Sequence, residues 1–126
     1  MRRADQRRAA VVALYQHEVT GRPLSDLIPP EARTFTHELA EGALATQEEL
    51  DVLIERYARN WSLDRIAPLE RAILRVSLFE MLHRADVPDE VAIDEAVEAA
   101  KELCAAEAAG FVNGILGAVK KDEVTG

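Results

Sequence analysis

The apolar residues of this chain recur with the spacing of amphipathic helices along most of its length. Over residues 6–19, Val11, Leu14, Tyr15 and Val19 follow an i, i+3, i+4, i+8 pattern, with charged and polar residues between them. No segment alternates apolar and polar residues with a period of two, as a half-buried strand would. The pattern therefore predicts an all-α fold.

Glycine and proline mark where the first helices end and begin. Gly21 and Pro23 follow the first apolar stripe and are expected to end that helix. A long helical stretch is predicted over residues 31–59, with a break or kink at Gly42 and residues 46–49. The segment 60–64, which reads Asn-Trp-Ser-Leu-Asp, is the next expected interruption.

Three further helices are predicted in the second half of the chain. The helix that starts near Pro68 is apolar on two sides, so we expect neighbours on both of them. A helix follows residues 86–89, and a last one begins near residue 110. Gly114 and Gly117 are interpreted as positions of close helix packing, and Gly110 as a junction between two helices. The whole is expected to form one domain, residues 1–126, of about six or seven helices.

Length and cysteine content add limits on the class of protein. A chain of 126 residues is long enough to bury a core without disulfides, and Cys104 is its only cysteine. Neither a signal peptide nor a run near the ~18 apolar residues of a membrane-spanning helix is found. We therefore expect a soluble, cytoplasmic protein.

Charge is distributed unevenly along the chain. The net charge is −8, but residues 1–8 carry four arginines against one aspartate, a balance of +3, which leaves −11 on the remainder. Such a protein would bind nucleic acid through its basic arm alone, since its acidic body repels phosphate. The acidic body suits a basic protein partner. The alternative is that the arginines are only a solvated terminus and the acidity serves solubility.

Catalytic and metal-binding patterns are absent from the sequence. His17, His37 and His83 are far apart and have no metal-ligand spacing, so neither a metal site nor a cofactor is predicted. Asp94 and Glu95 are adjacent on a predicted helix and would point about 100° apart, which does not suit a general acid/base pair. The chain is expected not to be an enzyme.

One charged residue stands within the apolar helix that starts near Pro68. A partly buried charge is costly unless it is paired, so we predict a structural ion pair between Arg75 and Glu95, or between Arg75 and Glu80.

Three blocks in fixed order carry a family resemblance. They read LERAILRVSLFE at 69–80, DVPDEVAIDEAVEAAK at 86–101 and GFVNGILG at 110–117, and Ala-Leu-Tyr stands at 13–15 in the arginine-bearing first helix. Together they resemble the NusB family of transcription antitermination factors. The resemblance is weakest over residues 20–65. It implies a bundle of about seven helices in two small subdomains.

The resemblance also implies a function. Proteins of this family pair with NusE, a small-subunit ribosomal protein, and the pair binds boxA RNA to modify RNA polymerase during transcription of ribosomal RNA. No cofactor is implied. The same fold occurs as a domain of ribosomal RNA cytosine methyltransferases, but no methyl-donor domain is present in these 126 residues. The alternative is a stand-alone NusB-like interaction module in ribosomal RNA processing or ribosome assembly, without strong RNA binding of its own. Self-association into a homodimer stays open.

Site residues follow partly from the resemblance and partly from the basic arm. RNA contacts are predicted at six residues: Arg2, Arg3, Arg7, Arg8, Tyr15 and Phe111. Glu70 matches a family glutamate at the junction of RNA and NusE, and Ser77 would share its helix face. Tyr15 and Phe111 have the alternative of being core aromatics. The chain departs from the family pattern at four positions that bear on RNA binding: Ala4, Asp5, Asp94 and Gly110.

Overall fold

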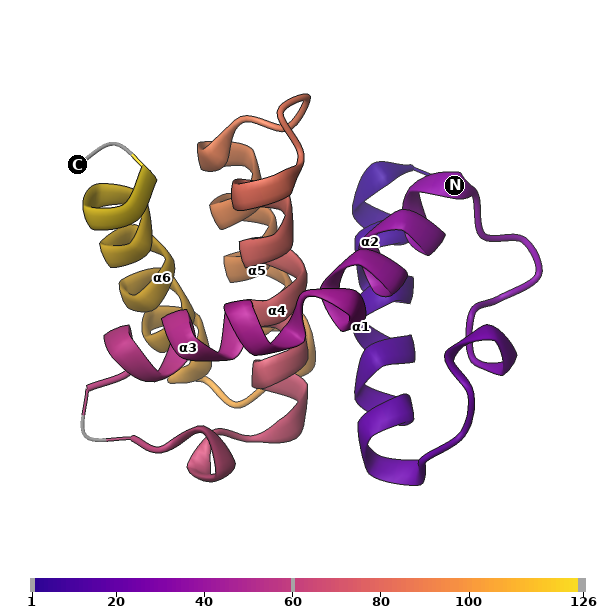
Figure 1. Ribbon diagram of the computed structural model, residues 1–126, viewed down its shortest axis with the longest axis horizontal. Helices are drawn as coiled ribbons and strands as arrows, with labels where there is room; N and C mark the ends of the chain where they lie inside the picture. Colours follow the sequence, from indigo (N-terminus) through magenta and orange to yellow (C-terminus); the bar gives the residue numbers. More distant parts are fainter. Residues whose placement is uncertain (1, 60, 125–126) are drawn as a thin grey trace.

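Six α-helices and three short turns of helix make up most of the computed structural model, which describes residues 2–59 and 61–124 (Figure 1). The ends of the predicted domain, residues 1 and 125–126, lie outside the described residues, as does Asn60 of the predicted 60–64 interruption. The helices are α1 (Arg3–Thr20), α2 (Thr34–Ala45), α3 (Gln47–Tyr57), α4 (Pro68–His83), α5 (Asp89–Leu103) and α6 (Ala108–Val119), with 3-10 turns η1 (Leu24–Asp26) and η2 (Leu63–Arg65) and a π-type turn η3 (Lys120–Val124).

The predicted helix boundaries at Gly21 and Pro68 are confirmed. Gly21 takes the left-handed backbone conformation (φ 75°), and its N–H donates to the His17 carbonyl at 2.9 Å, which ends α1. Pro68 occupies the first turn of α4, where its missing N–H costs nothing. The expected break within 31–59 is a helix boundary at Thr46, whose hydroxyl donates to the Gly42 carbonyl at 2.8 Å.

Close helix packing occurs at a different glycine from those predicted. A methyl group added at Gly42 would overlap the ring of Phe79, so the absence of a side chain lets α2 lie against α4. A Cβ at Gly110, Gly114 or Gly117 would meet no atom within 4 Å. The close-packing interpretation of Gly114 and Gly117 is therefore wrong, and Gly110 lies inside α6 rather than between two helices.

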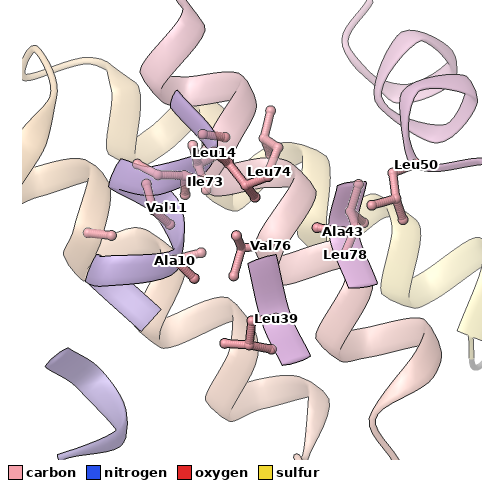
Figure 2. Close-up of a cluster of buried hydrophobic side chains, with 14 of the residues drawn as sticks. Ala10, Val11, Leu14, Leu39, Ala43, Leu50, Ile73, Leu74, Val76 and Leu78 are labelled. Carbon is pink, nitrogen blue, oxygen red and sulfur yellow. The ribbon is translucent and has the colours of Figure 1, made fainter. Parts of the chain in front are cut away.

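Helix α4 is the centre of the fold. It contacts α1, α2, α3, α5 and α6, as its two apolar sides predict. Figure 1 shows α1 and α2 at one end of the molecule and α5 and α6 at the other. Leu74 and Leu78 of α4 are fully buried, in a cluster that includes Leu39 of α2 and Leu50 of α3 (Figure 2). Each such leucine contributes about 1.5–3 kcal/mol by leaving water, so α4 holds both ends of the molecule together.

Candidate nucleic-acid interface

The predicted RNA contact Arg7 is buried in an ion pair. Its side chain is only 8% exposed, and Nε donates to both carboxylate oxygens of Glu80, at 2.9 and 3.1 Å. Burial raises the pKa of the Glu80 carboxyl, an effect that Arg7 partly offsets. Arg7 therefore stabilises the packing of α1 on α4. Its guanidinium is not available to an RNA phosphate in this conformation.

Arg75 is paired, but with neither predicted partner. Its Nε donates to Asp51 Oδ1 at 2.8 Å and its Nη1 donates to Glu18 Oε2 at 2.5 Å. The prediction that Arg75 pairs with Glu80 or Glu95 is wrong for a geometric reason. Residues five apart on a helix point about 140° away from each other, so Arg75 and Glu80 face different neighbours. Glu95 lies 3.8 Å from Arg8 instead.

Arg2, which precedes α1, and Arg3, its first residue, are more exposed than Arg7. The side chain of Arg2 is 85% exposed, and it lies 3.5 Å from Asp5. Arg3 is half exposed; it pairs with Asp86 at 3.3 Å, and its guanidinium lies 4.1 Å from the centre of the Phe35 ring. These two guanidinium groups are the ones in the predicted basic arm that a phosphate can reach most readily.

Arg8 is less exposed than Arg2 and Arg3 and more exposed than Arg7. Its side chain is 21% exposed, and its Nε donates to Glu102 Oε2 of α5 at 3.0 Å. A phosphate approaching Arg8 would have to compete with that carboxylate. The sequence showed four positive charges in residues 1–8, but it could not show that two of them, Arg7 and Arg8, pair with acidic residues of α4 and α5.

An aromatic pair projects from the surface between α3 and α6. Phe111 of α6 is partly buried against the core, and its ring meets that of Trp61 edge to face, with centroids 6.2 Å apart. Trp61 is 51% exposed. Tyr15, the other predicted aromatic contact, is also partly buried against the core. Trp61 was not among the predicted contacts, although a lone tryptophan in a polar interruption between apolar helices was a usable signal.

The aromatic pair borders an apolar hollow with acidic residues beside it. The hollow, of about 400 Å³, includes Glu70 of α4 and Glu107 from the segment before α6. Burial, and then the charge of Glu107, raise the pKa of the Glu70 carboxyl. A carboxylate pair beside two aromatic rings provides both a flat apolar surface and a place for positive charge. The remaining lining residues are Arg65, Ile66, Ala67 and Ala108.

Ser77 is more deeply buried than Glu70, which is only partly buried. It is 2% exposed, and its hydroxyl donates to the carbonyls of Ile73 and Leu74, at 2.8 and 3.1 Å. Although residues seven apart lie on the same face of a helix, α1 and α5 cover that face at Ser77. The prediction of a partner contact at Ser77 does not agree with its burial.

A second groove, of about 500 Å³, runs between the end of α3 and α6. Gly110 and Gly114 line it on the α6 side, and Trp61 and Phe111 border this groove as well as the hollow. The remaining lining residues are Arg56, Tyr57, Ala58, Arg59, Ile115, Ala118 and Asp122.

Neither a metal site nor a membrane-spanning helix occurs in the part of the chain that the structure describes. Within residues 2–59 and 61–124, no three histidine, cysteine or acidic side chains are arranged to hold a metal ion. No helix in these ranges is long and apolar enough to cross a bilayer. Burial, together with the charge of Glu70, raises the pKa of the Cys104 thiol, which disfavours a reactive thiolate.

Comparison with known proteins identifies the family. The chain matches the NusB family over residues 4–121. It is 39% identical to the transcription antitermination protein NusB of Symbiobacterium thermophilum, across 94% of this chain and 89% of that protein. The structure is similar to T. maritima NusB, with a TM-score of 0.86 and 33% identity over 97% of this chain and 92% of the other.

A second similar structure is that of a complex. It is described as the antitermination factors NusB and NusE with double-stranded RNA, and one of its chains matches with a TM-score of 0.82 and 26% identity, over 96% of this chain and 98% of that one. The family match, the curated relative and the similar solved structures agree. The chain belongs to the NusB family of transcription antitermination proteins.

Proposed function

We propose that this NusB-family protein pairs with NusE, a small-subunit ribosomal protein, and that the pair binds boxA-type single-stranded RNA to modify RNA polymerase during ribosomal RNA transcription. Its role is non-catalytic, and it acts in the cytoplasm as one domain. The observation that carries the proposal is the Trp61–Phe111 pair, in which the Trp61 ring is exposed, beside Glu70. A structural relative in complex with NusE and RNA supports it.

The aromatic pair supplies the base-binding element of the proposal. Single-stranded RNA is recognised largely by stacking of its bases on aromatic rings, which contributes about 1–3 kcal/mol per base. Trp61 has the more exposed ring, and Phe111 of α6 contacts this ring edge to face. Tyr15 is a further candidate for stacking. Arg2 and Arg3 are the guanidinium groups placed to meet phosphates, since Arg7 is engaged inside the fold.

The charge balance explains why a partner is needed. A net charge of −8 repels RNA, and the internal ion pairs leave few cations for phosphate. A basic ribosomal protein bound at the Glu70 hollow would add positive charge beside the aromatic pair. RNA binding by this chain alone is therefore weak, and the complex with NusE binds more tightly.

Titration of a fluorescent boxA-type RNA tests this function. Binding is measured by anisotropy at one fixed salt concentration, with the protein alone and with its NusE complex. Trp61→Ala is expected to weaken RNA binding by the complex about fivefold or more, the factor that corresponds to one lost stacking contact. Val91→Ala, a change at another exposed apolar residue, is the control and should bind normally.

The alternative function predicts a different result. A helical interaction module without RNA binding of its own would show the same affinity with and without NusE, and Trp61→Ala would have no effect. Phe111→Ala provides a second check, because Phe111 is partly buried. Circular dichroism must show that this variant still folds before its RNA affinity is interpreted.

A further inference from the structure

The turn η3 is attached to the end of α3 by two donors that meet at one oxygen. Arg56 Nη1 lies 2.8 Å from Glu123 Oε2, and the Tyr57 hydroxyl donates to the same oxygen at 2.5 Å. Arg56 and Tyr57 are consecutive residues, so the last turn of α3 presents a guanidinium and a phenol side by side. This arrangement is a binding position for an oxyanion, and a carboxylate of the same chain occupies it.

The position lies at the edge of the groove between α3 and α6. Arg56 and Tyr57 line this groove together with Trp61 and Phe111, and Asp122 of η3 reaches into it. Donors for an anion and rings for a base therefore border the same groove. A nucleotide combines these two chemical features, since it carries a phosphate and a flat base.

The attachment of η3 is of a kind that exchanges readily. The side chain of Arg56 is 52% exposed and that of Glu123 is 29% exposed. Exposed ion pairs contribute little free energy, because water and salt screen them and both side chains lose freedom. A phosphate presents several acceptor oxygens to the same two donors, and its negative charge is shared among them. Two of these oxygens can accept hydrogen bonds from one planar guanidinium.

We propose that Arg56 and Tyr57 form an oxyanion site that Glu123 occupies in the free protein and that a phosphate of single-stranded RNA takes over on binding. The 120–124 turn thereby competes with RNA and lowers the affinity of the free chain. This inference rests on the proposed RNA-binding function and adds both a phosphate contact and a regulatory element to it.

Glu123→Gln tests the competition in the 126-residue chain. The variant removes the carboxylate charge and keeps the size of the side chain, so boxA-type RNA should bind about two- to fivefold more tightly, the factor that corresponds to one exposed ion pair. Glu98→Gln makes the same change of net charge on α5, where Glu98 pairs with Lys101, and serves as the matched control. An equal gain in both variants would show a general charge effect and overturn the proposal.

Arg56→Gln separates the oxyanion site from the turn. The variant should bind RNA more weakly than the unmodified protein, because it lacks the phosphate donor. In the double variant, Glu123→Gln should bring no gain in affinity over Arg56→Gln alone, since the two side chains act on one site. A full gain in the double variant would mean that Glu123 acts elsewhere.

Failure of this inference can be distinguished from failure of the proposed function. If Trp61→Ala weakens RNA binding while Glu123→Gln binds like the unmodified protein, the proposed function holds and the competition is overturned. If neither the chain nor its NusE complex binds RNA, both are overturned. Circular dichroism of Glu123→Gln and Arg56→Gln checks that each variant retains the helical fold.

Discussion

Arg7 and Glu80 form an ion pair between α1 and α4 in which both carboxylate oxygens accept hydrogen bonds, and the two side chains are 8% and 1% exposed. Two charges so far from water are tolerated only because each satisfies the other. The pair fixes the register of the first helix on the central helix. It also turns an arginine of the basic arm into a structural residue.

Loss of one partner of this pair should be severely destabilising. Arg7→Met leaves the Glu80 carboxylate buried without its cation, and we expect the free energy of unfolding to fall by about 3–5 kcal/mol. Urea denaturation followed by circular dichroism measures it. The double variant Arg7→Met/Glu80→Met should recover much of the loss, since no buried charge remains. A double variant no more stable than Arg7→Met would contradict this explanation.

Alanine should have opposite effects at two glycines. Gly42→Ala places a methyl group against the ring of Phe79, and overpacking of this kind costs about 1–3 kcal/mol. Gly114→Ala meets open space inside α6 and should stabilise the protein by about 0.5–1 kcal/mol through helix propensity. Thermal unfolding of the two variants compares them directly. Phe79→Leu should relieve the cost at Gly42.

The Glu18 carboxyl should make stability depend on pH on the acid side. Burial acts to raise its pKa, but the hydrogen bonds from Arg71 and Arg75 outweigh burial and hold the pKa below the ordinary 4.5. A carboxyl with a depressed folded-state pKa contributes stability above its unfolded pKa and loses it as the pH falls. Stability should therefore decline below about pH 4.5, and Glu18→Gln should show a shallower decline. Denaturant titrations across this pH range measure both slopes; equal slopes would exclude Glu18 as a contributor.

Glu70 and Ser77 should differ in their effect on a basic partner. Glu70→Gln removes a carboxylate that lines the hollow, so NusE should bind more weakly, by about two- to tenfold. Ser77→Ala alters a buried hydroxyl that already bonds within α4, so NusE affinity should stay unchanged. Isothermal titration calorimetry gives both values. A larger loss at Ser77 than at Glu70 would place the interface elsewhere.

The elements of the fold were largely predictable because their signals are local. Gly21 stops a helix through its own backbone, and Pro68 starts one through its fixed φ angle, so neither depends on distant parts of the chain. The break before α3 was expected for the same reason. The spacing of the apolar residues then indicated which face of each helix is buried. The two apolar sides of α4 correctly predicted its central position.

The charge pairings were not predictable because they depend on how helices are rotated against one another. Arg75 was rightly expected to need a partner, but its partners Glu18 and Asp51 come from α1 and α3. The pairing of Arg7 with Glu80 joins residues 73 positions apart. The three sequence blocks, taken in order, indicated the family. Which arginines are exposed to RNA became clear only from the folded structure.

Trp61 has a practical consequence for the study of this protein. It is the only tryptophan of the chain, and it borders both the acidic hollow and the groove that η3 adjoins. Indole emission is therefore a built-in optical reporter that needs no dye or labelling chemistry. Quenching at this single ring would record a nucleobase or a partner arriving at either side, and stopped-flow mixing could follow that arrival in real time.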